Sequence, residues 1–400
     1  MNASIVIPTY WTDDAAKVRP RETVYDHPTE LRGGVETLTR CLRSLTKIRG
    51  DFETIVIAVP TRMELAEKVE KRVGGIAADF EGSLHVRCVY PSTLRRVKRR
   101  FSSLGLEKLS RHLSFRGYGN VRNLCILIPY LLGLDAAILV DDDEIVTDRD
   151  FVLKPLRSLG GRWRGKPVRG VVGYYVYRGR GYRLVEPQTL GSLAWNKAKL
   201  MNESFKIIRS PRRLNPTNFA FGGCMAIHRG LIAEVPFDPW ITRGEDIDYL
   251  LCSKAYGFKL PLDNQWSILH DPPPKKRGFW AEFEQDIYRF LYQREKLKVL
   301  EEKLNTHILE DIDPFPGYFL KEDLEGKILL TGILAGIEER GEKAVARESL
   351  SEMVKRFIKA GKLMRKPGRY AAKHAGRYLD FREGWREEME KLGRHTPLKI

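Results

Sequence analysis

The feature that most constrains the fold is an apolar run over residues 137–140 that is followed at once by four acidic residues, 141–144. A branched, apolar run of this length is typical of a buried strand, so the carboxylates are expected at an edge of a sheet. Adjacent carboxylates repel one another by roughly 1 kcal/mol per pair even in water. Mn2+ or Mg2+ would relieve this repulsion, especially with a diphosphate as a further ligand. The alternative is a solvated acidic turn.

Strand-like and helix-like segments alternate along the first part of the chain. We expect strands over residues 4–10, 54–60, 84–89, 137–140, 170–176, 219–227 and 266–270. We expect helices over residues 34–46, 64–73 and 245–255, with a further helix after the glycine turn at 117–119. This alternation predicts a parallel sheet, in which ligands bind at the carboxyl ends of the strands. Thr9, Tyr10 and the acidic run would meet there.

The chain of 400 residues, 42% of them hydrophobic, is long enough for a substantial core. Its character changes near residue 275, so we expect a catalytic domain over 1–275 and a basic, amphipathic helical region over 276–400. Helices are expected over 279–305 and 327–337, followed by a basic tail from residue 345. The tail either packs on the domain or lies on an anionic membrane.

Composition also limits the expected cellular compartment of the protein and the kinds of partner that it binds. The chain begins without a leader-like segment, and none of its segments is apolar enough to span a bilayer, which predicts a cytoplasmic protein, soluble or peripheral at the inner face of the membrane. Five separated cysteines disfavour disulfides and a zinc site. The net charge of +17 favours anionic partners, although nucleic acid is not expected. Few glutamines beside 30% charged residues hint at a thermophilic source.

A second acidic cluster, residues 245–248, follows Gly244 and opens a predicted helix. The helix dipole favours negative charge in the first turn, which would explain one or two of these acids. Two acidic clusters facing one sheet edge suggest a division of labour. One would bind a cation and the other would act as a general base.

Single residues at the same edge complete the candidate site. Gly222 and Gly223 precede an apolar strand, as expected where the backbone closely approaches a ligand. Arg122 follows the glycine turn, and its planar guanidinium either packs structurally or holds a phosphate or pyrophosphate. His270 ends the last strand and is a candidate third metal ligand.

Together these segments resemble the family 2-like glycosyltransferases of the GT-A fold, over roughly residues 3–275. The matching motifs, in the family's order, are residues 6–10, 121–123 for Ala-Arg-Asn, 141–143 for DxD, 222–223, and 244–248 for GEDxD. The resemblance implies a GT-A, Rossmann-like α/β fold with a mixed, mainly parallel sheet, here extended by C-terminal helices. It also implies a hexosyltransferase.

The family's residue roles carry over position by position. Nucleotide-sugar binding falls on Pro8, Thr9, Tyr10, Arg122, Asp141, Asp142, Gly222 and Gly223. The DxD carboxylates Asp141 and Asp143 would hold Mn2+ or Mg2+, joined by His270, while Asp246 would be the base with Glu245 beside it. The reaction would move a sugar, with inversion of its anomeric carbon, from a nucleoside-diphosphate sugar to a hydroxyl of a glycan, a lipid-linked or a small phosphorylated acceptor.

The sequence departs from the family pattern at one position, and two other classes of protein remain as alternatives. The strand over 54–60 ends without the Asp that reads the nucleobase in the family, so uracil, guanine and thymine remain alternatives. A sugar-1-phosphate nucleotidyltransferase should carry a glycine- and arginine-rich loop after its first strand, and residues 9–14 are not one. A non-enzymatic polyanion-binding protein would explain the positive charge but not the two acidic clusters.

Overall fold

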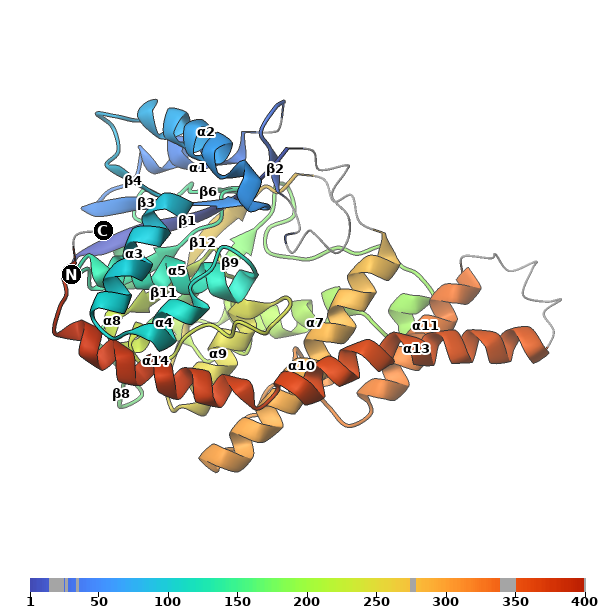
Figure 1. Ribbon diagram of the computed structural model, residues 1–400. Coiled ribbons are helices and arrows are strands. Elements are labelled where there is room, and N and C mark those ends of the chain that lie inside the picture. The colour runs from blue at the N-terminus through green and yellow to red at the C-terminus, as the bar shows by residue number, and fades with distance from the viewer. Residues whose placement is uncertain (14–24, 26–27, 34–35, 274–277, 339–349, 399–400) are drawn as a thin grey trace.

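The computed structural model describes all residues except 14–24, 26–27, 34–35, 274–277, 339–349 and 399–400 (Figure 1). Within the described residues, ten strands form one sheet whose main order is β10-β12-β9-β11-β5-β1-β3-β4. These eight strands are β1 (Ala3–Thr12), β3 (Phe52–Pro60), β4 (Val86–Val89), β5 (Ala136–Leu139), β9 (Gly170–Val176), β10 (Leu214–Asn215), β11 (Met225–His228) and β12 (Leu262–His270). The short strands β2 (Thr29–Glu30) and β6 (Glu144–Ile145) pair with β1 and β12, and β7 (Arg162–Trp163) pairs with β8 (Lys166–Pro167).

The sheet is mixed and mainly parallel. Strands β5, β1, β3 and β4 run parallel to one another, and β12 runs parallel to β9. Strand β11 is antiparallel to both β5 and β9, and β10 is antiparallel to β12. The central strands are buried on both faces, as their continuous apolar runs predict. The α/β class expected from the sequence, with a mixed, mainly parallel sheet, is confirmed.

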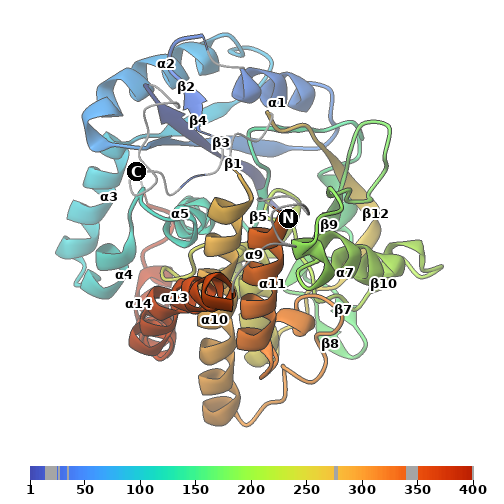
Figure 2. The ribbon, with the colours of Figure 1, turned by 90° about the vertical axis from the view of Figure 1, so that its right-hand side faces the viewer.

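Helices cover both faces of the sheet (Figures 1 and 2). Helices α1 (Thr37–Leu45) and α2 (Ala66–Ala78) lie on one face, and α5 (Tyr118–Leu131) lies on the other. Residues 34 and 35 of the first predicted helix lie outside the described residues. The remaining helices of the first 275 residues are α3 (Pro91–Ser103), α4 (Glu107–His112), α6 (Leu153–Leu156), α7 (Lys197–Ser204), α8 (Arg229–Ile232) and α9 (Glu245–Ala255), with 3-10 turns η1 (Met63–Leu65), η2 (Gly191–Leu193) and η3 (Phe205–Arg209).

One predicted strand is shorter than expected. The sequence predicts a strand over 219–227, but the ladder begins only at Met225. A turn precedes it, in which the amide of Cys224 donates to the carbonyl of Phe221 at 2.9 Å. This turn sets Gly222 and Gly223 at the edge of the sheet, where the candidate site lies.

The C-terminal region is helical, as predicted. It contains α10 (Phe279–Leu304), the turn η4 (Gly317–Phe319), α11 (Leu324–Glu338), α13 (Leu350–His374) and α14 (Arg377–Gly393). Helix α13 crosses α10 (Figure 1), and α14 lies against the sheet domain beside α4. The predicted boundary at 275/276 lies outside the described residues, so the division into two domains stays a prediction.

The last part of the basic tail packs on the domain. Tyr378, Trp385 and Met389 of α14 are buried. The Tyr378 hydroxyl donates to the carbonyl of Pro236 at 2.9 Å, and the Trp385 indole donates to the carbonyl of Ile232 at 2.8 Å. These apolar side chains face protein, which favours packing over the membrane alternative for this helix. Among the described residues, we find no helix of the length and apolarity that crossing a membrane requires.

Candidate functional site

Arg122 joins the two acidic clusters that the sequence predicts at one sheet edge. Helix α5 carries Arg122, Asp141 follows β5, and Glu245 opens α9. The guanidinium contacts both Asp141 oxygens, with Nη1 2.8 Å from Oδ1 and Nη2 3.0 Å from Oδ2, and Nε donates to Glu245 Oε1 at 3.2 Å. Burial alone would lower the pKa of Arg122, but the charges of Asp141 and Glu245 raise it well above its ordinary value. The Arg122 guanidinium is therefore held between two carboxylates. Its contact with a nucleotide stays a prediction.

Asp142 is held from the strand side. It is buried, and it accepts hydrogen bonds from the hydroxyls of Thr9, at 2.6 Å, and Thr37, at 3.2 Å. Burial, together with the charge of Asp143, raises the pKa of Asp142 to about 8. Pro8 and Thr9 are buried in β1. The Thr9 side chain thus positions a carboxyl, and nucleotide binding by these residues stays a prediction.

Tyr10 lies at the rim of this edge. Its half-buried ring packs on Tyr25, with centroids 4.1 Å apart, and on Tyr118, with centroids 5.8 Å apart. The backbone amide of Gly117 donates to the Tyr25 hydroxyl at 3.1 Å. Among Pro8, Thr9 and Tyr10, only Tyr10 is less than fully buried, and its ring lies in an aromatic setting that suits contact with a flat ring.

The glycine pair makes room for protein side chains. A Cβ at position 222 would overlap the Arg122 guanidinium, and a Cβ at position 223 would overlap the Glu144 carboxylate. Glu144 is fully buried and accepts a hydrogen bond from the amide of Asp141 at 2.8 Å. Burial and the charge of Asp141 raise the pKa of Glu144 well above its ordinary value. The sequence predicts close approach at Gly222 and Gly223, and the groups that approach them here are Arg122 and Glu144.

Asp143 and His270, the predicted metal ligands, lie next to each other at this edge. Their side chains are 14% and 22% exposed, and His270 Nε2 lies 3.6 Å from Asp143 Oδ2. The ring of Tyr175 stacks on His270, with centroids 4.6 Å apart, and His270 Nδ1 has no hydrogen-bond partner in the described part of the chain. Asp141 can offer a metal only the lone pairs that Arg122 leaves free.

A complete metal cage is not preformed. The residues that the structure describes contain no cluster of three or more His, Cys, Asp or Glu side chains at metal-binding spacing. Mg2+ and Mn2+ commonly bind through one or two carboxylates, with phosphate and water oxygens completing the shell. The carboxylate and imidazole donors of Asp143 and His270 therefore fit such an ion as part of its coordination.

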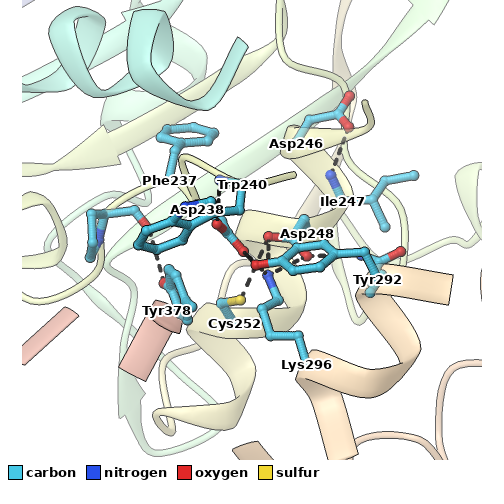
Figure 3. Close-up of polar contacts among 12 residues, drawn as sticks. Phe237, Asp238, Trp240, Asp246, Ile247, Asp248, Cys252, Tyr292, Lys296 and Tyr378 are labelled. Atoms are coloured by element: carbon cyan, nitrogen blue, oxygen red, sulfur yellow. Dashed lines mark hydrogen bonds and ion pairs between the residues drawn. The ribbon is translucent and has the colours of Figure 1, made fainter. Parts of the chain in front are cut away.

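The predicted catalytic carboxyls occupy the first turn of α9. Asp246 Oδ2 accepts from the amide of Gly222 at 3.1 Å. Its Oδ1 accepts from the amide of Ile247 at 2.7 Å, as Figure 3 shows. Burial raises the pKa of Asp246, although Arg289 and these amides act in the opposite direction. Burial likewise raises the pKa of Glu245 to about 7, partly offset by Arg122. The helix N-terminus favours ionisation, but here desolvation outweighs it.

The last acid of the GEDxD segment has a structural role. Asp248 is fully buried, and Lys296 of α10 lies 2.6 Å from its Oδ1 and 2.5 Å from its Oδ2 (Figure 3). Lys296 also donates to Asp238 Oδ2 at 2.8 Å, and the Tyr292 hydroxyl donates to the same oxygen at 2.6 Å. This buried network fixes α9, and hence Asp246, against the C-terminal helix α10.

Sequence reasoning missed three residues near the site. The Tyr175 hydroxyl oxygen accepts a hydrogen bond from the amide of Gly223 at 3.0 Å. Tyr175 lies near the end of a predicted strand, and this position could have indicated that it belongs to the site. Arg289 and Lys296 belong to α10, where they are two of several basic residues in an amphipathic helix. The sequence offers no local pattern that separates these two from their solvated neighbours.

Comparisons with known proteins find similarity in structure only. No family model matches the chain, and no curated protein matches it. A solved structure of a mannosyltransferase from Pyrobaculum calidifontis with GDP-Man and Mn2+ is similar at 12% identity and a TM-score of 0.43, over 96% of this chain and 86% of that chain. Glucosyl-3-phosphoglycerate synthase from Mycobacterium tuberculosis, solved with Mn2+, UDP and phosphoglyceric acid, is 16% identical with a TM-score of 0.35, over 76% and 79%. A mycobacterial protein is 18% identical with a TM-score of 0.36, over 76% of each chain. Likeness at this level does not assign a function.

Proposed function

We propose that this protein is a metal-dependent glycosyltransferase of the GT-A fold, family 2-like, which moves a sugar from a nucleoside-diphosphate sugar to an acceptor hydroxyl with inversion. The observation that carries the proposal is the meeting of two acidic clusters from distant parts of the chain. Arg122 bridges Asp141 of one cluster to Glu245 of the other. One cluster contains Asp143, which lies beside His270, and the other contains two carboxyls of raised pKa.

Each group has a distinct task in this reaction. Asp143, His270 and the free lone pairs of Asp141 would hold Mn2+ or Mg2+, which when bound supplies positive charge that stabilises a leaving diphosphate. Asp246 takes the proton of the acceptor hydroxyl on a carboxylate oxygen, while the amides of Gly222 and Ile247 fix its orientation. Attack from the side opposite the leaving group inverts the anomeric carbon.

The raised pKa of Asp246 suits a general base. A carboxylate with an ordinary pKa is a weak proton acceptor at neutral pH, whereas one whose pKa is raised accepts a proton more readily. Burial of Asp246 supplies this change, and Arg289 and the two amides limit it. Glu245, which Arg122 contacts at 3.2 Å, would hold the acceptor hydroxyl beside the base.

Nucleotide-sugar turnover tests the proposal directly. UDP-, GDP- and TDP-sugars are incubated with the protein in Mn2+ or in EDTA, and the release of nucleoside diphosphate is measured. We expect Mn2+-dependent release from one donor class, and Asp143→Ala should abolish it. Asp79→Ala is the control, because Asp79 is an exposed residue at the end of α2.

Two companion assays test for the other two classes of protein. Pyrophosphate released from a nucleoside triphosphate and a sugar-1-phosphate would indicate a nucleotidyltransferase instead. Retention on a polyanion column without turnover of any donor would indicate a binding protein. Either result contradicts the proposed transfer reaction.

A further inference from the structure

Arg289 of α10 lies directly against the start of helix α9. Its side chain occupies the space that a Cβ on Gly244 would need, and Gly244 has a φ of 68°. Both the left-handed backbone and the guanidinium therefore require glycine at this position. Since Gly244 immediately precedes Glu245 and Asp246, Arg289 reaches the base side of the candidate site.

Arg289 is a buried cation for which the described part of the chain provides no hydrogen bond. The residue is 7% exposed, and its Nε and Nη2 atoms have no partner among the residues that the structure describes. Its guanidinium lies 4.9 Å from the ring centre of Phe290 and 6.0 Å from that of Phe315. Burying an unpaired charge is costly, so such a group is usually paired or bound to a ligand.

Two other buried arginines are paired with carboxylates. Arg122 contacts Asp141 and Glu245. Arg294, which lies on α10 like Arg289, is 6% exposed and donates to the Glu325 oxygens at 2.8 and 2.5 Å. Arg289 lacks an equivalent carboxylate, and this contrast points to an external anion.

The nearby acids do not supply the missing partner. Asp286 is engaged by Lys197 at 2.5 Å and by the Trp195 indole at 3.2 Å. Asp246 exerts an electrostatic pull on Arg289, but its two oxygens accept backbone amides and no ion pair with Arg289 occurs within 4.0 Å in the described residues. Arg243, whose Nη1 donates to Gln285 at 3.2 Å, adds a second positive charge to the surroundings of Arg289.

We infer that Arg289 binds an anionic group, a phosphate or a carboxylate, of the acceptor next to Asp246. This inference rests on the proposed function and narrows its acceptor to an acidic molecule. The acidic groups whose charges act on Arg289 are Asp246, Asp286 and Glu245, and the predicted metal ligands Asp143 and His270 are not among them. Arg289 is therefore on the side of the base, where the acceptor hydroxyl must lie. The diphosphate of the donor is the other anionic group that Arg289 could bind.

Inorganic phosphate is the probe for the anion site, and thermal unfolding is the measurement. We expect phosphate at tenfold its Kd to raise the midpoint of the wild type by roughly 2 °C, by ligand linkage. Arg289→Gln should remove this rise and should not lower the midpoint without phosphate, because it removes an unpaired buried charge. Arg294→Gln is the matched control, which should lower the midpoint but keep the rise. An equal rise in wild type and Arg289→Gln, or none in the wild type, overturns the inference.

Nucleoside diphosphate binding distinguishes the acceptor from the donor. Calorimetric titration of UDP, GDP and TDP in Mn2+ should give a Kd for Arg289→Gln within about twofold of the wild type. Weakening of about tenfold or more would assign Arg289 to the donor diphosphate and overturn the acceptor assignment. If the wild type binds none of the three, the proposed function and the acceptor assignment both fail. The phosphate result still decides whether Arg289 forms an anion site.

Discussion

Lys296 and Asp248 form a fully buried ion pair in which the ammonium nitrogen lies 2.6 and 2.5 Å from the two carboxylate oxygens. Lys296 belongs to the C-terminal helix α10, and Asp248 belongs to the helix that carries the predicted base (Figure 3). The C-terminal region therefore helps to build the site. Residues beyond 275 position one of its two acidic clusters.

Lys296→Met should destabilise the protein by about 3–5 kcal/mol, because it leaves Asp238 and Asp248 buried without their cation. Urea unfolding measures the loss. Lys298→Met is the control on the same helix, since Lys298 pairs with Glu322 at the surface and should cost less than about 1 kcal/mol. A similar small loss in both variants would show that the buried network does not hold α9.

Replacing both acids tests the same network from the other side. The triple variant Lys296→Met, Asp238→Asn, Asp248→Asn removes every charge of the network. It should recover much of the stability that Lys296→Met loses, because no unpaired buried charge remains. Failure to recover would assign the loss to packing of the lysine stem.

Gly223→Ala should destabilise the fold by about 1–3 kcal/mol, the usual cost of overpacking, because the added Cβ overlaps the buried Glu144 carboxylate. Gly75→Ala is the control. Gly75 lies within α2 with no neighbouring atom within 4 Å of an added Cβ, so alanine there should stabilise by about 0.5–1 kcal/mol. Denaturant midpoints of the two variants should move in opposite directions, and equal shifts would contradict the tight contact at Gly223.

The pH dependence of stability should report on Asp142. Its pKa rises from 3.8 to about 8 on folding, so the folded state binds the proton more tightly than the unfolded chain. The resulting stability is present in full below the unfolded pKa and is lost as pH rises through about 8. Glu245, with a pKa raised to about 7, acts in the same direction. The metal-free protein should therefore lose on the order of 3 kcal/mol between about pH 5 and pH 8.5.

Asp142→Asn should flatten this slope. The Asn oxygen can still accept from the hydroxyls of Thr9 and Thr37, so the geometry survives while the titrating group is lost. Asp148→Asn is the control, because Lys154 lowers the pKa of Asp148 in spite of burial, which places its effect at acidic pH. An unchanged slope in Asp142→Asn would show that Asp142 does not bind a proton on folding.

The sequence predicts the fold well where strand and helix patterns are strong. The apolar runs at β1, β3 and β5 are buried on both faces, so their position in the centre of the sheet follows from composition alone. The position of Asp141 also follows from the rule that ligands bind at the carboxyl ends of strands, and that of Glu245 follows from its place in the first turn of a predicted helix. These two parts of the site depend on backbone topology, which the pattern encodes.

Contacts between distant side chains could not be predicted in the same way. The sequence does not show that Arg122 pairs with two carboxylates while Arg289 forms no ion pair in the described part of the chain, because both depend on the final packing of α5, α9 and α10. The tail gives a similar example. Its basic, amphipathic pattern suits both a membrane surface and a protein surface, and only burial of Trp385 and its neighbours separates the two for α14.

The last prediction concerns the base. Asp246→Asn should lower transfer to the acceptor by roughly a hundredfold or more, the scale of a lost general base, with nucleoside diphosphate affinity nearly unchanged. Both Asp246 oxygens accept backbone amides, and an Asn can satisfy only one of them, so we also expect a loss of about 1 kcal/mol in stability. Thermal midpoints must therefore be measured beside the rates, at a temperature where both proteins are folded.

Glu245→Gln and the pH profile complete this test. Glu245 is expected to hold the acceptor hydroxyl, so its variant should raise the KM for acceptor more than it lowers kcat. In the wild type, kcat should fall as pH drops through the raised pKa of Asp246, because protonation removes the proton acceptor. If Asp246→Asn keeps normal turnover while Glu245→Gln loses it, the base is Glu245. If both variants stay active, the first turn of α9 serves only to begin a helix, and the inverting mechanism loses its main support.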